Sequence, residues 1–300
     1  MAHNFYVVIA TSGRRALLRR TLVSLSQCRI PGAFRETIVI ENGPERAVED
    51  VVTATHHLLN ARYMYDPWAN KSNALNKVLD TLDDGLIFFT DDDVRIDPDA
   101  LMTYQQATDN DLHGYYYGGP VTIDYEQDPA DWLIPHLPPS ARGWQLDETV
   151  TGRPTCFLGC NWAAFVKDLK QVGGFDITKG PGSRTGSMGA ETAVQLRLYE
   201  HSVRARYIPD AVVSHFVPWE RCTPVWVLRR LFRTGVTRAT WGAVRKWGQN
   251  SSSFQNRQIV WAREMLGEVV NGNWHAIFGV FKKSAYLAGY LKGKWITRQP

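Results

Sequence analysis

Three consecutive aspartates, Asp91 to Asp93, follow five uncharged residues that are typical of a buried strand. Like charges this close repel and raise one another's pKa, so we expect a nearby cation to balance them. Clustered carboxylates at a strand end suit a hard divalent ion such as Mg²⁺ or Mn²⁺, whose remaining ligands are water and substrate phosphates. The alternative for the bare tripeptide is a solvated turn that caps a helix.

Two other chemistries lack their sequence patterns. A phosphatase-type Asp-x-Asp motif that ends at Asp93 would need Thr or Val at the position of Arg95. The glycine-rich dinucleotide fingerprint is absent after the first predicted strand, which argues against a dehydrogenase.

Alternating strands and helices are expected to position the aspartates. Apolar, β-branched runs predict strands, and apolar residues at helical spacing predict the helices between them. The expected strands cover residues 5–10, 36–43, 61–66 and 85–90, and the expected helices cover residues 15–28 and 71–82. This alternation favours an α/β fold with a mostly parallel sheet, in which ligands bind beyond the carboxyl ends of the strands. Thr11, Glu41 and the aspartates follow such ends, so we expect them to share one crevice.

The second half of the chain predicts less regular elements. Asp97 is expected to cap, and Pro98 to begin, a helix that runs to residue 107. The further predicted elements are a strand at 114–125, a loop at 126–153, a strand and helix at 154–176, a Gly/Ser-rich segment at 178–191, a helix at 191–202, a strand or hairpin edge at 205–218, and helices after residue 224 with a polar break at 248–257.

Charge is distributed unevenly along the chain. Residues 220–300 contain 14 Lys and Arg against 3 Asp and Glu, whereas residues 1–219 carry a balance of −7. A basic, aromatic-rich region can bind phosphates, nucleic acid or an anionic membrane, or can be a solvated face. We expect no signal peptide, because the first residues lead directly into an apolar run that is typical of a strand, and no run approaches the ~20 apolar residues of a spanning helix. The four cysteines lack zinc-site spacing, so we expect free thiols in a reducing cytoplasmic setting.

Five stretches together resemble the family 2 glycosyltransferases, which are nucleotide-sugar enzymes of the GT-A fold. In the family's order they are VVIATSGRRALLRRTLVSL, IVIENGP, KSNALNKVLDTLDDGLIFFTDDD, LGCNWAAFVKDLKQVGGFD and GAETAVQLRL. The resemblance implies a GT-A type, Rossmann-like catalytic domain at residues 1–219, with a nucleotide-binding half at about 1–97 and an acceptor-binding half at about 98–219. A basic helical C-terminal region would occupy residues 220–300.

The resemblance also implies residues that bind the nucleotide-sugar donor. Thr11 and Arg14 would line the nucleotide pocket, and Glu41, where the family usually has Asp, would accept a hydrogen bond from the base or ribose. The other implied roles are a phosphate contact for Lys71, pocket support for Asn76, sugar or ribose contacts for Asp91 and Asp92, and diphosphate contacts for Arg221 and Arg229. The alternatives are a turn carboxylate at Glu41, an exposed helix face at Asn76 and ordinary basic surface at the arginines.

Two residues are implied at a metal ion. Asp93 would ligate Mn²⁺ or Mg²⁺, and His215 resembles a histidine that lies near the metal and diphosphate in this family. A neutral imidazole suits that place, although a histidine at a strand end is often only a surface residue.

Glu191 is the implied general base. Aligned backwards from the Leu-Arg-Leu at residues 196–198, it falls on the Asp of the family's Glu-Asp pair, with Ala190 at the preceding Glu. It would take the proton of the acceptor hydroxyl as that oxygen attacks the anomeric carbon, in a single displacement that inverts this centre. In the other register Thr192 matches the Asp, and no base remains.

The acceptor side is expected to include Trp132, Trp162 and Asn161, with core packing as the alternative for Trp162. The implied partners are a nucleotide-sugar donor, with UDP-sugars favoured over GDP- or dTDP-sugars, and a saccharide, lipid-linked or small-molecule acceptor. Residues 276–295 mix apolar stripes with lysines, which suits either an interfacial helix on an anionic membrane or a helix packed on the catalytic domain. We expect a cytoplasmic protein, free or peripheral on the inner face of the membrane.

Two rival functions stay open at this point. A sugar nucleotidyltransferase also uses aspartates and a metal, and the TSGRR at residues 11–15 faintly resembles its glycine-rich loop. A non-catalytic carbohydrate-binding protein of the same fold is the other, because the register at Glu191 is ambiguous. Nucleic-acid binding is not expected, since the basic residues are spread over helices without a recognised motif.

Overall fold

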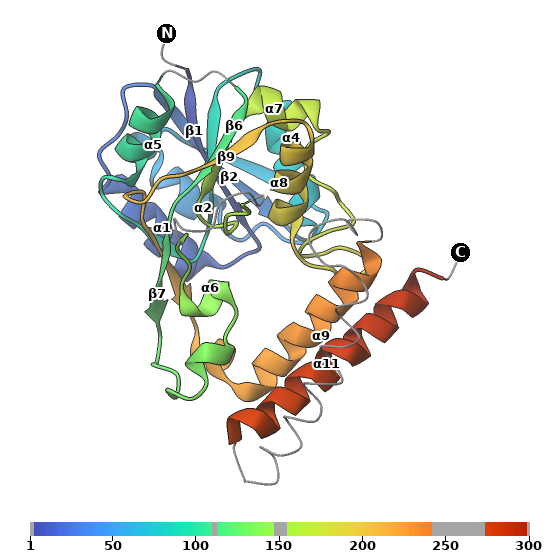
Figure 1. The fold of residues 1–300 in the computed structure, drawn as a ribbon. Coiled ribbons are helices and arrows are strands. Elements are labelled where there is room, and N and C mark those ends of the chain that lie inside the picture. The colour runs from blue at the N-terminus through green and yellow to red at the C-terminus, as the bar shows by residue number, and fades with distance from the viewer. Residues whose placement is uncertain (1–2, 110–112, 147–154, 242–273, 299–300) are drawn as a thin grey trace.

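A seven-stranded sheet forms the centre of the protein, whose computed structural model describes residues 3–109, 113–146, 155–241 and 274–298 (Figure 1). The strand order is β3-β2-β1-β4-β8-β6-β9. Of these described strands, β8 alone is antiparallel to its neighbours, so the predicted mostly parallel α/β sheet is confirmed. The strands are β1 (Phe5–Thr11), β2 (Phe34–Asn42), β3 (Ala61–Asp66), β4 (Leu86–Asp91), β6 (Tyr115–Gly118), β8 (Trp162–Phe165) and β9 (Arg204–Tyr207).

Helices cover both faces of this sheet, because successive side chains of a strand point to opposite faces. On β1, Phe5, Val7 and Ile9 point into one apolar cluster, and Val8 and Ala10 point into the other. The first cluster is covered by α1 (Arg15–Ser26), α2 (Glu49–Thr53), α3 (His56–Leu59) and α5 (Ala100–Thr108), and the second by α4 (Lys71–Asp80), α7 (Val166–Gln171) and α8 (Ala190–Glu200). The result is a three-layer arrangement with apolar side chains on both faces of the sheet.

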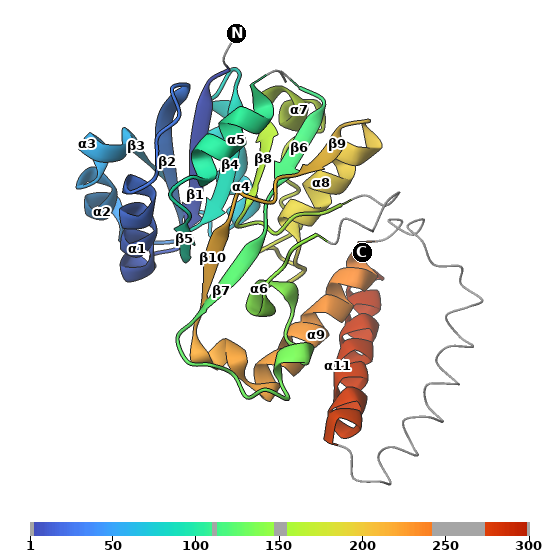
Figure 2. The same ribbon diagram turned by 60° about the vertical axis from the view of Figure 1, so that its left-hand side comes forward.

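A second, three-stranded sheet extends beyond the first (Figure 2). It contains β5 (Val94–Ile96), β10 (Val213–Val217) and β7 (Val121–Tyr125) in that order. Two predictions are therefore wrong, since residues 114–125 and residues 205–218 each form two strands that belong to different sheets.

The change of sheet has a local cause at Gly119 and Pro120. A Cβ at Gly119 would lie 2.0 Å from the carbonyl oxygen of Ala211, so the two chains cross in direct backbone contact. Asn161 donates to the carbonyl oxygens of Pro120 and Ala211, at 2.9 and 2.8 Å. Proline has no N–H to continue a strand ladder, and the pairing of β6 ends before it.

Helix α5 begins two residues later than predicted. Asp97 closes a turn instead of capping the helix, because its carbonyl oxygen accepts from Ala100 N and its carboxylate accepts from Asp99 N, both at 3.0 Å. Asp99 is the N-cap residue, and its carbonyl oxygen accepts the first helical bond from Thr103 N.

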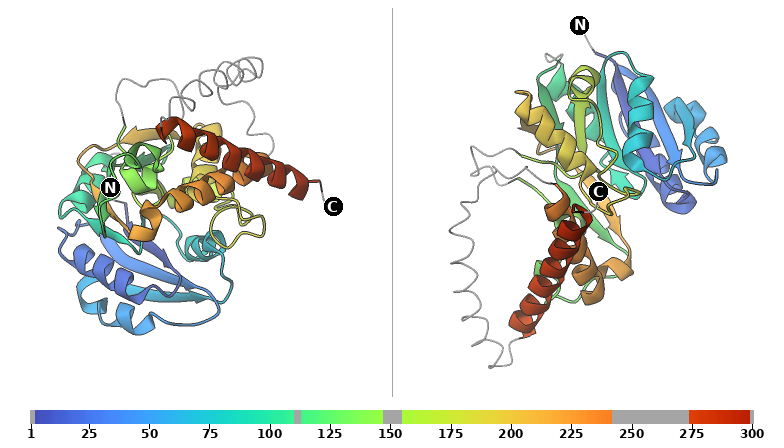
Figure 3. Two further views of the ribbon diagram at one scale, coloured as in Figure 1. Left: turned by 90° about the horizontal axis from the view of Figure 1, so that it is seen from below. Right: turned by 90° about the vertical axis from the view of Figure 1, so that its right-hand side faces the viewer.

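The described part of the C-terminal region is helical, as predicted. Helices α9 (Pro224–Thr240) and α11 (Trp274–Ile296) lie side by side (Figures 1 and 3). Their backbones touch, since a Cβ at Gly289 would lie 1.9 Å from the carbonyl oxygen of Phe232. An apolar cluster that includes Val227 and Phe278 joins both helices to three short helices from two separate segments, η1 (Ile134–His136) and α6 (Pro139–Arg142) in one and η2 (Trp219–Cys222) in the other. The predicted loop at 126–153 therefore contains helical turns.

Several sequence predictions have other outcomes. No described helix combines the length and the apolar character that crossing a membrane requires. All four cysteines lie in the described residues and are free, as predicted. The predicted break at residues 248–257 lies outside the described residues. The domain boundary between residues 219 and 220, and that between 97 and 98, stay predictions.

Candidate active site

The aspartate cluster and Thr11 meet where β1 and β4 end. The two strands are parallel, with Ala10 opposite Asp91, so the residues that follow them lie at one edge of the sheet. Thr11 Oγ1 donates to Asp92 Oδ2 at 2.5 Å, and both side chains are buried. Glu41 lies opposite Thr11 at the end of β2. The three strand ends therefore lie along one edge of the sheet, and the expectation that they share one crevice stays a prediction.

Arg14 supplies the expected cation. Its Nη1 donates to Asp93 Oδ2 at 2.6 Å and its Nε to Asp92 Oδ2 at 3.0 Å, and its Nη2 also contacts Asp92. Arg14 immediately precedes α1, so the first loop of the sheet delivers this charge to the carboxylates. Two like charges in adjacent, buried positions are thus held by one guanidinium.

His215 reaches Asp93 through the second sheet. β10 is antiparallel to β5 with His215 opposite Val94, and Phe216 N donates to the carbonyl oxygen of Asp93 at 2.8 Å. His215 Nε2 lies 3.4 Å from Asp93 Oδ1, and Arg221 Nη1 lies 3.8 Å from Asp93 Oδ2. Burial alone would raise the pKa of Asp93, but His215 and Arg14 hold that pKa below the ordinary value of an aspartate.

This pair fits one side of a divalent-ion site. Asp93 Oδ1 is buried and has no hydrogen-bond partner among the described residues, while Arg14 occupies Oδ2. A carboxylate oxygen and an imidazole nitrogen 3.4 Å apart are close enough to share an ion whose bonds are about 2.1 Å long. Among the described residues no group of three His, Cys, Asp or Glu is arranged for a metal. An ion here would therefore depend on water and on the phosphates of a substrate.

Lys71 joins the aspartates to Glu191. Its Nζ lies 2.7 Å from Asp91 Oδ1 and 2.7 Å from Glu191 Oε1, and all three side chains are mostly buried. Lys71 is the first residue of α4, which Asn70 caps by accepting from Asn73 N, and Glu191 lies in the first turn of α8. Burial alone would raise the pKa of Glu191, but the Lys71 ammonium holds it below the ordinary value of a glutamate.

Gly159 leaves the space that Glu191 occupies. A Cβ at Gly159 would lie 2.7 Å from Glu191 Cδ and 2.8 Å from Oε1. Its backbone φ lies outside the left-handed region, so it is the closeness of the glutamate that requires glycine here. The turn before β8 thus packs closely against the Glu191 carboxylate.

Arg230 is a further functional candidate beside Arg221 and Arg229, the two arginines expected at the diphosphate. Its pKa is lowered, first by burial and then by the positive charges of Arg221 and Arg233, and its charge acts on Glu191. The predicted Arg229 is exposed on the helix surface. Val227, buried three residues before Arg230, marks the inward face of α9, and Arg230 lies closer to this face than Arg229 does.

Two predicted donor-side residues make internal contacts. Glu41 is buried, and its carboxylate accepts from Ala47 N at 2.9 Å, Val48 N at 3.3 Å and Tyr63 Oη at 2.6 Å. Any nucleotide contact of Glu41 would have to share these oxygens. Asn76 exchanges two hydrogen bonds with the backbone of Phe175, so it fastens α4 to the Gly-Gly turn.

The acceptor-side predictions are corrected in two places. Trp162 is fully buried and stacks on Phe89 at 4.7 Å, so it is a core residue and not a surface for a sugar. Asn161 is fully buried, and its amide accepts from Tyr104 in addition to its two backbone contacts, so it is structural. Trp132 is partly exposed and packs edge-on against Phe278 of α11 at 5.4 Å.

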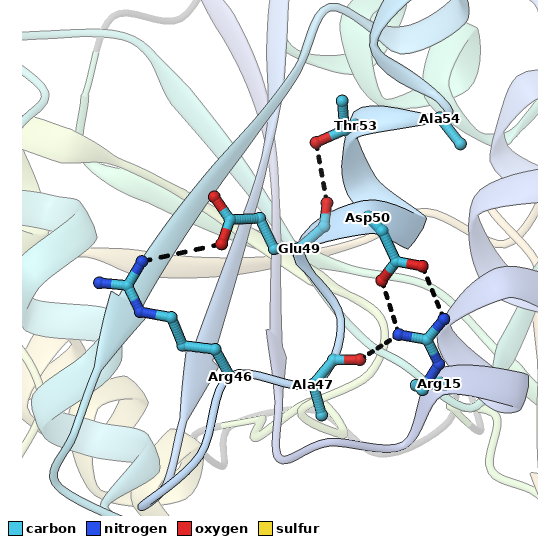
Figure 4. Close-up of a pocket in the computed structure, with 7 residues that line it drawn as sticks. All are labelled: Arg15, Arg46, Ala47, Glu49, Asp50, Thr53 and Ala54. Carbon is cyan, nitrogen blue, oxygen red and sulfur yellow. Dashed lines mark hydrogen bonds and ion pairs between the residues drawn. The ribbon is translucent and has the colours of Figure 1, made fainter.

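A separate open hollow of about 640 Å³ lies between α1 and α2 (Figure 4). Arg15 reaches across it to Asp50 with two hydrogen bonds of 2.6 and 2.7 Å, and Arg46 lies 3.7 Å from Glu49. The other residues that line it are Ala47, Thr53 and Ala54, so none of the aspartate cluster takes part. Its charges pair with one another, and nothing about it indicates chemistry.

Several solved structures share this fold, among them the following three. The mannosyltransferase PcManGT from Pyrobaculum calidifontis, in complex with GDP-Man and Mn²⁺, superimposes with a TM-score of 0.62 at 17% identity, over 99% of this chain and 89% of that one. S. aureus TarS 1-349 gives 0.52 at 12% identity over 99% and 91%, and GalNAc-T7 with UDP, GalNAc and Mn²⁺ gives 0.53 at 12% over 86% and 54%. These likenesses show the GT-A type fold.

The sequence comparison shows the family. No curated protein sequence matches the chain. The sequence profile described as "Glycosyl transferase family 2" matches residues 6–172, which is more than half of the 300 residues and includes both sides of the aspartate cluster. The chain therefore belongs to glycosyl transferase family 2.

Proposed function

We propose that the protein transfers a sugar from a nucleotide-diphosphate sugar to a hydroxyl group of an acceptor, with inversion at the anomeric carbon. The observation that carries the proposal is the Lys71 ammonium, which lies 2.7 Å from both Asp91 and Glu191. It brings the aspartates expected to hold the donor and the carboxylate expected to activate the acceptor into one site. A single in-line displacement requires the residues that hold the donor and the residue that activates the acceptor to lie in the same site.

The donor would lie along the ends of β1 and β4. Thr11, Arg14, Asp91 and Asp92 are the residues proposed to line the nucleotide and sugar subsites, with a UDP-sugar favoured and GDP- or dTDP-sugars as alternatives. The solved relatives are described with GDP-Man or with UDP, so they do not favour one base.

Arginines of the C-terminal region would bind the diphosphate. Arg221 and Arg230 lie near Asp93 and Glu191, and their mutual repulsion favours an anion between them. We propose Arg230 in the role expected for Arg229, because Arg229 is exposed. Lys71, held by two carboxylates, would act on Glu191 more directly than on a phosphate.

Asp93 and His215 would hold Mn²⁺ or Mg²⁺. When bound, such an ion neutralises charge that develops on a diphosphate leaving group. The relatives described with Mn²⁺ are consistent with this proposal. Within the chain itself, Arg14 leaves Asp93 Oδ1 available by occupying Oδ2 alone.

Glu191 would act as the general base. The proton of the acceptor hydroxyl passes to the Glu191 carboxylate while the acceptor oxygen forms a bond to the anomeric carbon. The bond from this carbon to the diphosphate oxygen breaks, and the nucleoside diphosphate leaves with the electron pair. Lys71 keeps the carboxylate ionised in its buried position, so the base is ready at neutral pH.

Replacement Glu191→Gln tests the proposal. It keeps the shape of the side chain and removes the base, so we expect transfer to fall by about 10²-fold or more while donor binding is kept. Transfer is measured as release of nucleoside diphosphate, and binding as the thermal shift with UDP-, GDP- and dTDP-sugars and Mn²⁺. The control Glu36→Gln removes a carboxylate that pairs with Arg62 away from the site. Unchanged turnover in Glu191→Gln would remove Glu191 from this role.

A further inference from the structure

The outward side of α11 is apolar over most of its length. Val280, Leu287, Leu291 and Trp295 recur at helical spacing on one stripe, and Phe281 lies beside it. Between 39% and 61% of each of these side chains is exposed. Large apolar residues in a continuous exposed row are unusual on a protein that is surrounded only by water.

The orientation of α11 is fixed by its other side. Gly289 and Gly293 pack against the backbone of α9, where a Cβ at Gly293 would lie 2.8 Å from the carbonyl oxygen of Val236. At the N-terminal end, Phe278 is buried in the cluster that contains Val227 of α9. These contacts leave the apolar stripe directed away from α9, and the helix cannot turn it inward without losing them.

Positive charge borders the stripe. Lys283 and Lys294 lie along one edge and Lys292 along the other, and all three side chains are exposed. Neither α9 nor α11 contains an acidic residue, although together they carry four arginines and four lysines. An apolar stripe between cationic edges is the arrangement of a helix that lies in a lipid–water interface.

We propose that the exposed side of α11 docks flat on a bilayer that contains anionic phospholipids. Val280, Phe281, Leu287 and Leu291 would enter the boundary of the acyl chains, and the lysines would contact lipid phosphates. Trp295 lies near the end of the stripe, and tryptophan prefers the level of the headgroups. The inference does not depend on the transfer reaction.

A second copy of this chain fits the same surface less well. A two-fold contact through α11 would place the lysines of one copy against those of the other, with no acidic residue of α9 or α11 to balance them. An anionic lipid surface carries the opposite charge to these lysines, and it is apolar where the stripe is apolar.

Docking in this way would place the catalytic residues close to the membrane. Arg230 lies on nearly the opposite side of α9 from Phe232, Gly235 and Val236, which face α11. α11 lies on the side of α9 away from the central sheet (Figures 2 and 3). One helix layer, about 10 Å thick, would then separate the arginines of the site from the docked helix.

Vesicle flotation of the full chain tests the proposal. We expect binding to phosphatidylcholine vesicles that contain phosphatidylglycerol, weak binding to phosphatidylcholine alone, and release at high salt. The variant Leu287→Gln/Leu291→Gln should weaken binding about tenfold or more. Its control, Val23→Gln/Leu58→Gln, changes two residues on α1 and α3 with exposed fractions of 48% and 54%, and should bind as the parent does.

The outcomes are separable from those for catalysis. Both double variants should keep the donor-induced thermal shift of the parent, since neither pair belongs to the site. The proposal would be overturned if the parent protein did not float with the anionic vesicles even at low salt. It would also be overturned if the Leu287→Gln/Leu291→Gln variant bound these vesicles as tightly as the parent does. A dimer in light scattering that this variant dissociates would also overturn it, because the stripe would then be a contact between copies.

Discussion

Replacement Lys71→Met is the sharpest test of how the site is organised. The methionine side chain has a similar length and no charge, so Asp91 and Glu191 lose the cation between them, which lies 2.7 Å from each. Burial would then raise the pKa of the Glu191 carboxylate, opposed only by smaller effects such as the charge of Arg230. The base would be protonated over a pH range in which the parent enzyme has it ionised.

The size of the effect follows from the contact distance. Two unit charges 2.7 Å apart attract by about 6 kcal/mol at an effective dielectric constant of 20. Water that enters the vacated space recovers part of this. We therefore expect the acid limb of the rate profile to move upward by about 1–2 units.

The folding stability of Lys71→Met should depend on pH in the opposite direction to that of the parent protein. In the parent protein the lowered pKa of Glu191 contributes stability above the pKa of the unfolded chain, and this is lost as pH falls through the folded value. In Lys71→Met the folded pKa lies above the unfolded one, so the variant is destabilised at neutral pH and recovers as pH falls. Removing one partner of a buried ion pair costs about 3–5 kcal/mol, and we expect a deficit of this size at pH 7.

The assay is the pH dependence of kcat/KM for transfer, together with thermal unfolding at acid and neutral pH. Lys71→Arg keeps the charge and should keep the acid limb close to its original place. Lys77→Met is the matched control, because Lys77 lies on the same helix and pairs with Asp66 at 2.7 Å. A uniform loss of rate with an unmoved acid limb would refute the reasoning.

Three further predictions concern single residues of the site. Gly159→Ala places a Cβ 2.7 Å from Glu191 Cδ and should lower kcat about tenfold or more, whereas Gly32→Ala, with no atom within 4 Å of the new Cβ, should not change it. Arg230→Gln should raise the KM for the donor about tenfold, because a charge-assisted hydrogen bond to the diphosphate contributes about 1.5 kcal/mol. Arg229→Gln should leave this KM unchanged, and equal effects of the two variants would disprove the assignment. EDTA should stop transfer and Mn²⁺ should restore it, and Asp93→Asn should abolish the Mn²⁺-dependent thermal shift with donor, so a shift that persists would exclude Asp93 as a ligand.

Local patterns determined much of the fold. Apolar β-branched runs and helically spaced leucines were sufficient for β1 to β4, α1 and α4, because burial on these elements follows a simple period along the chain. The direction of the strands was also sufficient to predict that Thr11 lies near Asp92, because the carboxyl ends of neighbouring parallel strands meet at the same edge of a sheet.

Patterns were insufficient where one short segment belonged to two sheets. The alternation of apolar residues in 114–125 is the same whether the chain continues straight or crosses another backbone. The crossing at Gly119 depends on contact with Ala211, which lies far along the chain. Likewise, Trp162 has a residue type that suits a sugar surface, and only its neighbours Phe89 and Phe175 decide that it is core.

The sequence by itself determined the family, the sheet flanked by helices and the presence of an acidic cluster at the edge of this sheet. The family resemblance implied His215 beside Asp93, but only the tertiary structure decided the contacts around the cluster: β10 pairs with β5 and brings His215 to Asp93, and Lys71 joins Asp91 to Glu191. It also decided that Arg230, on the inward face of α9, acts on Glu191. The physical reason is range. Periodicity reports the environment of each residue along its own strand or helix, whereas hydrogen bonds and ion pairs between distant segments depend on which elements pack together.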